Sequence, residues 1–408
     1  MGTGESDCLV VGAGIGGAVL ALSLAKWGYR VVILERETVV PSWGRPEVLA
    51  QSTIQTFQRL GVDSSLLSDT IVPLRGLQIR DAGGGPLLII TADDLTQAGV
   101  QPYSIDPGQV RSLLLQQAQR TGAVRVERGV EVQELVKDAS RLAGVRARKG
   151  SEAVEYRTHL LVGDDGTYSR VRSGLGISLR LQDLPIDFLV PSEILAQAVE
   201  PIGQGWLNPG QLGRRGLGAG LVMPLPKGKA AMALGLRRGA YEQLSGSFAG
   251  TETFAQMLTK LSPMCAQLLR DRKFPGGYVR IKRLFGHAPR YVADGAALIG
   301  DAAHPVTPIG GQGANMAVAD AVALAEVAHE ALQRRDCSAI SLHPYQAHRW
   351  PANERSLQFS RRGRTVLQTL ITLPWLAPLA PWLVRRNNRP EIRQRLLRAI
   401  ATAFASDA

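Results

Sequence analysis

The chain has 408 residues, which is enough to bury a large core and to form two closely joined domains. Its three cysteines include no CxxC pair and its six histidines do not cluster at metal spacing, which argues against a disulfide framework and a metal site. The net charge of +12 is concentrated near the C-terminus, and outside that segment no basic-aromatic face indicates nucleic-acid binding.

The chain opens with a strand, a glycine turn, a helix and a second strand. Residues 8–11 read as a short apolar strand, 18–26 as a helix of small residues and 30–34 as the second strand. This βαβ opening predicts a parallel sheet. No charged segment followed by a cleavable apolar run stands before it, so we expect no secretory signal and a cytoplasmic location.

The glycine turn carries the first candidate binding residues. Gly12 permits the sharp turn, Gly14 lets the backbone approach a diphosphate, and Gly17 lets helix and strand pack closely. The helix N-terminus presents unpaired N–H groups to the phosphates, and Glu35 can accept hydrogen bonds from ribose hydroxyls, with Arg36 beside it. The turn alone does not separate FAD from NAD. Its residues are Gly12, Ala13, Gly14, Ile15, Gly16 and Gly17.

The chain then changes character twice. Residues 71–100 alternate apolar and polar and predict strands joined by a turn, and 124–163 read as further strands. The stretch 176–285 has Pro and Gly breaks, strand-like pieces and one helical piece over 253–269, which indicates a second domain. Nucleotide-binding character returns at 296–325.

Three later motifs bring a family resemblance. Residues 163–172, GDDGTYSRVR, look like the DG motif of flavin-dependent aromatic hydroxylases, and 298–315, LIGDAAHPVTPIGGQGAN, look like their GD motif. Residues 342–349 resemble the family's LxxYxxxR segment. The chain therefore resembles the FAD-dependent aromatic and quinone hydroxylases, the single-component class A flavin monooxygenases similar to para-hydroxybenzoate hydroxylase, and partly the ubiquinone-biosynthesis hydroxylases. The resemblance spans residues 7 to about 350 and is weakest across 176–285.

The resemblance implies a set of FAD-binding residues. Asp301 would hold ribityl or pyrophosphate oxygens, and a helix opening in the GD motif would point its N–H groups at the flavin pyrimidine edge, where reduced flavin is negative. Arg45 matches an arginine near the phosphates, with a surface arginine as the alternative. Val132 matches a backbone contact to adenine, with a plain core residue as the alternative. The remaining members are Asp165, Gly300, Pro308, Gly311, Gln312, Gly313, Ala314 and Asn315.

Two positions depart from the family pattern. Pro107 stands where many relatives have Arg or Gln. Arg111 either takes over the role of that residue or is an ordinary solvated arginine of the helix, and the two interpretations are equally supported. Asp164 stands where Ala is common in the DG motif. No residue is assigned as catalytic, because in this class the flavin is the chemical agent.

The fold expected is α/β: a Rossmann-like FAD-binding domain, an inserted β-sheet substrate domain and C-terminal helices. The expected limits are 1–75, 101–175 and 286–335 for the FAD-binding domain, 76–100 and 176–285 for the substrate domain, and 336–408 for the helical region.

The resemblance implies a monooxygenase that hydroxylates an aromatic, quinol or polycyclic small molecule with O₂ and NADH or NADPH through a flavin C4a-hydroperoxide. A second GxGxxG is absent, which fits the class with one nucleotide domain. Two alternatives stay open: an FAD-dependent reductase of an isoprenoid double bond, and a non-catalytic flavin-binding protein associated with membranes. The oligomeric state stays open as well.

The C-terminal segment is basic and apolar. Nine arginines stand against one acid between Arg361 and Arg398, around the uncharged run 366–384. Its length approaches a membrane span, but three prolines would break a spanning helix. Further along, Ile392, Leu396, Ile400 and Phe404 share one helix face, with most arginines elsewhere. Peripheral contact with the inner face of an anionic membrane and packing on the protein itself are equal alternatives.

Overall fold

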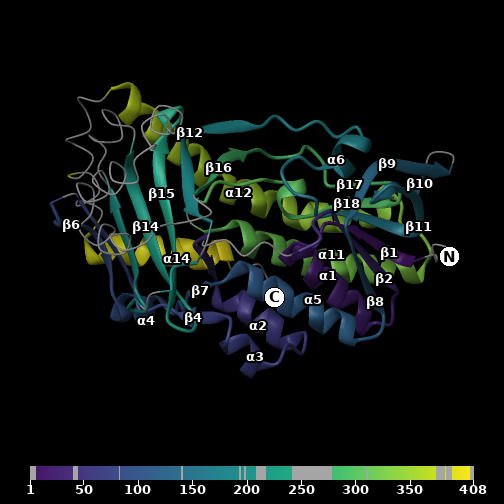
Figure 1. Ribbon diagram of the computed structural model, residues 1–408, viewed down its shortest axis with the longest axis horizontal. Helices are drawn as coiled ribbons and strands as arrows, with labels where there is room; N and C mark the ends of the chain where they lie inside the picture. Colours follow the sequence, from purple (N-terminus) through teal and green to yellow (C-terminus); the bar gives the residue numbers. More distant parts are fainter. Residues whose placement is uncertain are drawn as a thin grey trace.

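The computed structural model describes residues 6–39, 45–81, 83–138, 141–192, 194–196, 199–207, 217–240, 278–308, 311–373, 382 and 388–404. Figure 1 shows these residues arranged as two sheets side by side, with helices packed around the one at the right and the C-terminal helix running along the other.

The first sheet is mainly parallel and carries the N-terminal strands. β1 pairs in parallel with β2 and with β11. The first half of β11 pairs with β10, and β10 pairs with β9, both in antiparallel fashion. Within the described residues its order is β17 (Val292–Ala293), β18 (Ala296–Leu298), β11 (Glu152–Gly163), β1 (Ser6–Val11), β2 (Val31–Glu35) and β8 (Val124–Arg128), with β9 (Val130–Asp138) and β10 (Arg141–Lys149) off this path.

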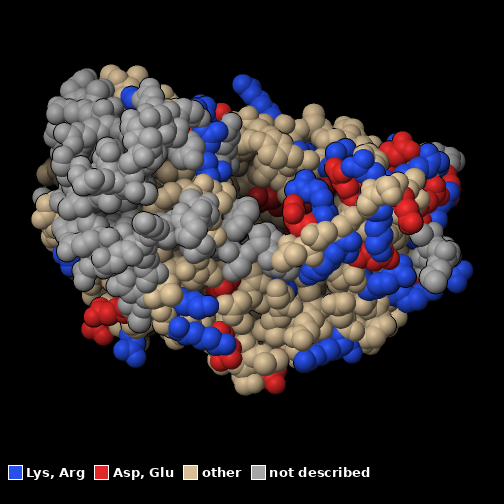
Figure 2. All heavy atoms as spheres, in the orientation of Figure 1, with Lys and Arg blue, Asp and Glu red and all other residues tan. Residues whose placement is uncertain are grey.

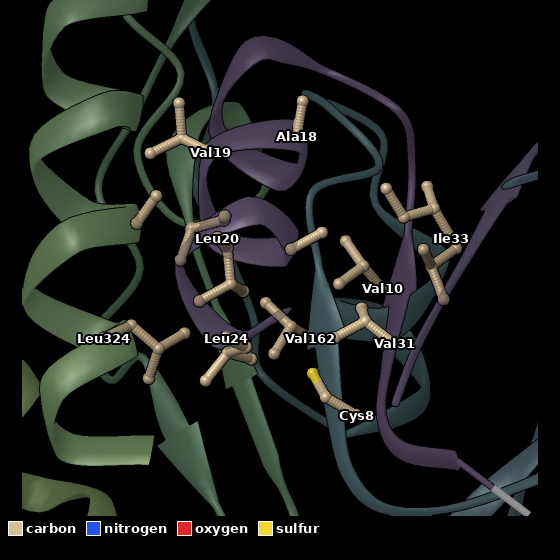
Figure 3. Packing of buried hydrophobic residues seen from close by; sticks show 14 of the residues in the cluster. Cys8, Val10, Ala18, Val19, Leu20, Leu24, Val31, Ile33, Val162 and Leu324 are labelled. Atoms are coloured by element: carbon tan, nitrogen blue, oxygen red, sulfur yellow. The ribbon is translucent and has the colours of Figure 1, made fainter. Parts of the chain in front are cut away.

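Three helices pack on this sheet: α1 (Ile15–Lys26), α5 (Pro107–Arg120) and α11 (Gly313–Gln333). Figure 3 shows Leu20 and Leu24 of α1 packed between Leu324 of α11 and Val162 of β11, and all four side chains are fully buried. Burying one such side chain contributes roughly 1.5–3 kcal/mol. This core fixes where the N-termini of α1 and α11 lie.

The second sheet is mostly antiparallel, and it includes β5 and β6 from early in the chain because β5 pairs in parallel with β13. In the described chain its order is β16 (Tyr278–Phe285), β12 (Gln182–Pro191), β15 (Lys229–Arg237), β14 (Leu217–Leu225), β13 (Gly203–Leu207), β5 (Leu77–Arg80) and β6 (Pro86–Ile90). A small sheet joins β3 (Glu47–Leu49), β7 (Tyr103–Ile105) and β4 (Ile71–Pro73).

The remaining elements connect the sheets or cover them. They are α2 (Gln51–Arg59), α3 (Ser64–Ser68), α4 (Ala92–Ala98), α6 (Arg170–Gly174), the 3₁₀ turn η1 (Gly300–Ala302), α12 (Ala339–Thr372) and α14 (Pro390–Phe404).

The α/β fold predicted from the sequence is confirmed, with one local correction. Residues 92–98 form a helix, although the alternating pattern over 71–100 predicted only strands and a turn. Thr91 and Asp94 form a capping box at its start, and Gly99 ends it with a φ of +67°. The domain limits stay predictions, and the helix expected over 253–269 lies outside the described residues.

The C-terminal helix α14 packs on the substrate sheet. Leu397 lies in an apolar cluster with Ile90 and Leu95, and the Arg393 guanidinium forms an ion pair with Asp94 at 3.0 Å. One face of α14 therefore contacts protein. Among the described residues, no helix combines the length and the hydropathy that crossing a bilayer requires. The side chains of Leu396, Ile400 and Phe404 lie outside the part described.

Candidate cofactor site

The glycine turn lies at the carboxyl end of β1 and leads into α1. Gly12 has a φ of +103°, and a Cβ on it would lie 2.2 Å from the Asp164 carbonyl oxygen. A Cβ on Gly17 would lie 2.8 Å from the Gly12 carbonyl oxygen, so helix and strand pack as closely as the sequence indicated. Both positions require glycine, for the turn and for the close approach.

Glu35 reaches back from the end of β2 to this turn. Its carboxylate is buried and accepts a hydrogen bond from the backbone N–H of Ala13 at 3.1 Å and another from Glu37 at 2.8 Å. The acid predicted to meet a ribose thus lies beside the turn predicted to meet a diphosphate. Arg36, by contrast, is exposed and pairs with Glu37 at 3.3 Å.

Asp164 fills the space beneath the turn. Its carboxylate is the nearest group to Gly14, where a Cβ would lie 2.4 Å from Oδ2, and it accepts a hydrogen bond from the Gly17 N–H at 2.8 Å. Burial raises the pKa of Asp164 well above its ordinary value, the Gly17 N–H opposes this rise, and the charges of Asp165 and Asp301 add to it. The sequence singled out Asp164 only as a departure from the family pattern.

The same carboxyl group joins the turn to the GD motif. A Cβ on Gly300, whose φ is +57°, would lie 3.2 Å from Asp164 Oδ1, and one on Gly16 would lie 3.3 Å from the same atom. The glycine turn, the DG motif and the GD motif therefore meet at one point, at the carboxyl ends of β1, β11 and β18. Open α/β sheets bind their ligands at this edge.

Arg111 is the clearest indication of an anion site. It lies on α5, and its buried Nε and Nη2 find no hydrogen-bond partner within the described part of the chain. Burial lowers the pKa of Arg111, and the nearby Glu35 carboxylate opposes this shift. Arg128, opposite Glu35 in the β2–β8 pairing, likewise has a buried unpartnered Nη1 among the described residues. A buried cation without an acceptor is costly, so an anionic group such as the FAD diphosphate fits here.

The GD segment contributes Asp301 and brings it near Arg45. The Thr167 hydroxyl donates to Asp301 Oδ2 at 3.3 Å. Arg45 donates to both carboxylate oxygens of Glu47, at 3.0 and 2.9 Å. The charge of Glu47 is the main reason that the pKa of Arg45 is raised, and the Asp301 charge contributes to the rise.

The N-terminus of α11 follows the GD segment, as the sequence predicted. Gly311 has a φ of +65°, Gln312 is buried at the N-cap position without a side-chain capping bond, and Gly313 and Ala314 begin the helix. The side chain of Asn315 bonds to protein instead: its Oδ1 accepts from the Ala50 N–H and the Thr53 hydroxyl, and its amide donates to the carbonyls of Val48 and Gly311. Asn315 thereby holds the helix start against β3 and α2.

Asp165, Val132 and Pro308 were also predicted to contact the cofactor, and the structure shows the protein environment of each. Asp165 Oδ2 accepts from the N–H groups of Arg170 and Val171 at the start of α6, while its buried Oδ1 has no partner among the described residues. Val132 has a buried side chain in the core of the first sheet. Pro308 is exposed, and 309–310 next to it lie outside the described residues. Cofactor contacts by these residues stay predictions.

Sequence reasoning missed one buried cluster. Asp320 of α11 is fully buried; it hydrogen-bonds His304, accepts from Arg349 Nε at 2.9 Å and from the Gly300 N–H at 3.1 Å. Burial alone would raise the pKa of Asp320, but His304 and Arg349 hold it below its ordinary value. The available signal was a lone acid in an otherwise apolar helical pattern, AVADAVALA. This cluster anchors the start of the GD motif.

Comparisons with known proteins agree with this geometry. The sequence matches the FAD binding domain family over residues 5–225 and 281–360. It is 28% identical over 403 residues to 6-methylpretetramide 4-monooxygenase of Streptomyces rimosus, covering 97% of this chain and 92% of that protein. It is 28% identical over 364 residues to ubiquinone hydroxylase UbiL of Rhodospirillum rubrum, covering 85% and 78% of the two chains.

A solved structure shares the fold. The structure of PqsL, a probable FAD-dependent monooxygenase from Pseudomonas aeruginosa, superposes with a TM-score of 0.74 at 24% identity, covering 90% of this chain and 97% of that one. At this level of identity, the likeness concerns the architecture alone.

Proposed function

Because this chain belongs to the FAD binding domain family, we propose that it is a flavin monooxygenase that uses NAD(P)H and O₂ to hydroxylate an aromatic, quinol or polycyclic small molecule. The observation that carries the proposal is the meeting of the turn, the DG motif and the GD motif around Asp164, beside the unpartnered guanidinium of Arg111. The monooxygenase and hydroxylase names of its relatives support the reaction class.

The proposed roles of this chain's residues are binding and orientation. Glu35 would accept the ribose hydroxyls, Arg111 and the N-terminus of α1 would hold the diphosphate, and Asp301 would accept from the ribityl chain. The N–H groups that open α11 would face the flavin ring. Bound FAD supplies the redox chemistry, accepting a hydride and activating O₂.

The second sheet would cover the reacting ring and exclude water. β12 of this sheet packs against α12, and Leu184 and Phe285 share an apolar cluster with Val306 and Met316, which flank the GD loop. A substrate held between this sheet and the flavin would be shielded from solvent, which favours transfer of oxygen to the substrate over wasteful release.

The test is substrate-stimulated oxidation of NAD(P)H. Purified protein is expected to be yellow, and its flavin is expected to be reduced anaerobically by NADH or NADPH. With a panel of phenols, quinols and polycyclic aromatics, at least one compound should raise NAD(P)H and O₂ consumption together. Consumption that no compound stimulates would contradict the proposal. Anaerobic saturation of an isoprenoid double bond would instead favour the reductase alternative.

The C-terminal segment supports a further proposal, peripheral contact with an anionic membrane. Val366, Leu373 and Trp382 are exposed, and Arg361 and Arg362 lie on the preceding turn of α12 with exposed side chains. Exposed apolar and aromatic side chains beside arginines are typical of helices that lie on anionic bilayers.

A further inference from the structure

A recess lies outside the proposed cofactor site, where the end of the second sheet meets α12. Its volume is about 800 Å³, within the range of small-molecule sites. Arg180 comes from the loop before β12, Arg237 and Arg238 from the end of β15, and Arg364 from α12. Figure 2 shows Lys and Arg side chains gathered on this face around the end of β12.

The charge of this recess is unbalanced. Among its described lining residues, Asp183 is the only acid against the four arginines. The Asp183 carboxylate pairs with Arg238 at 2.7 Å. Arg364 donates through Nε to the Asp183 backbone carbonyl at 3.0 Å, which is neutral and does not balance the guanidinium charge. From residue 355 to 372, α12 has no acid. Positive charge in excess of this kind attracts an anionic ligand, and guanidinium groups match phosphate geometry.

The recess is linked to the GD loop through α12. Ile371, which lines it, packs against the cluster that contains Val306 and Met316. Ser360, four residues or about one helical turn before Arg364, hydrogen-bonds the Thr307 hydroxyl at 2.9 Å. A ligand anchored at Arg364 therefore lies one layer of side chains from the segment proposed to face the flavin.

We propose that this pocket binds the phosphate groups of the pyridine nucleotide that reduces the flavin, an inference that rests on the function proposed above. The chain has a single GxGxxG turn, which the FAD would use, so the electron donor requires another anion site. This recess is large enough for a nucleotide, and none of its lining residues is among those assigned to FAD.

The experiment uses FAD-loaded protein and charge reversal. Arg180→Glu and Arg364→Glu are made singly and together. Each single variant is compared with Arg355→Glu, which changes the net charge by the same amount on an exposed residue of α12 outside the pocket. Stopped-flow measurement of anaerobic flavin reduction over a range of NADPH and NADH concentrations gives the half-saturating concentration and the limiting rate. FAD content and unfolding temperature check that the variants fold.

For each pocket variant, the half-saturating nucleotide concentration should rise roughly 10- to 100-fold, as expected for loss of a charge-assisted contact. The limiting reduction rate and the FAD content of each pocket variant should equal those of the wild type. Arg355→Glu should resemble the wild type in all three quantities. Unchanged half-saturation in the double variant would overturn the pocket assignment and leave the proposed function standing. A wild-type flavin that neither nucleotide reduces would contradict the proposed function, and the assignment with it.

Discussion

The Asp164 carboxylate accepts a hydrogen bond from the Gly17 N–H at 2.8 Å, inside the turn that leads into α1. A buried acid thus lies beneath a loop whose helix terminus favours negative charge, at the point where the DG and GD motifs meet. This contact ties three distant segments together, and it places a side chain with a raised pKa at the point where they meet.

Asp164→Asn should stabilise the protein increasingly as pH rises. The pKa of Asp164 in the folded protein is raised above its ordinary value of 3.8, so the folded state binds the proton more tightly than the unfolded chain. Between pH 3.8 and the raised pKa of the folded protein, the wild type therefore loses stability as the pH rises, and the Asn variant does not. Unfolding temperatures of both proteins from pH 4 to pH 8 measure the difference.

Asp63→Asn provides a control of opposite sign. Asp63 is exposed, and hydrogen bonds from Ser65 lower its pKa, so its contribution is present above its unfolded pKa and is lost as the pH falls. Its replacement should cost stability at neutral pH and cost less in acid. A variant-minus-wild-type difference for Asp164→Asn that is flat across this pH range would contradict the role assigned to the buried acid.

Arg111→Met should separate cofactor binding from stability. Its buried Nε and Nη2 have no hydrogen-bond partner among the described residues, so its removal relieves the cost of two unsatisfied donors in the FAD-free protein. The FAD-free variant should unfold at the same temperature as the wild type or higher, while its FAD affinity falls roughly tenfold or more. Flavin-fluorescence titration and calorimetry measure the two effects. Lower stability with unchanged FAD affinity would assign Arg111 a purely structural role.

Much of this site could be predicted because its signals are local. The glycine turn follows a buried strand, and Glu35 ends the next one, so both positions could be read from spacing. The hydrogen-bond partners of Asp164 and Asp320 could not be predicted from the sequence, because each acid accepts from donors on elements distant in sequence. Helix α4 was missed although Thr91 and Asp94 have capping-box spacing, since the apolar alternation before it favoured a strand.

Asp301→Ala should lower FAD occupancy. Asp301 lies at the carboxyl end of β18, and its proposed hydrogen bonds to the cofactor are charge-assisted, so their loss is expected to cost on the order of 1.5–3 kcal/mol of FAD binding. Titration of FAD-free protein with FAD gives the dissociation constant. Asp138→Ala, which removes an exposed acid paired with Arg157, is the control. Equal dissociation constants for wild type and Asp301→Ala would show that Asp301 does not hold the cofactor.

The C-terminal segment should bind anionic vesicles at low salt. Each arginine near such a surface contributes about 1 kcal/mol, and an exposed tryptophan adds interfacial affinity. Trp382→Ser combined with Arg362→Ser should shift the protein from the vesicle pellet to the supernatant. Trp27→Ser, at an exposed tryptophan beside α1, should not. Wild-type protein that stays in the supernatant at low salt would favour packing of this segment on protein.

The proposed monooxygenase reaction is tested most directly by turnover under isotopically labelled O₂, with the compound that best stimulates NAD(P)H oxidation. We expect one labelled oxygen atom in each hydroxylated product molecule, formed in proportion to the NAD(P)H consumed, and no product without O₂. Product that forms anaerobically, or aerobic product without the label, would contradict it.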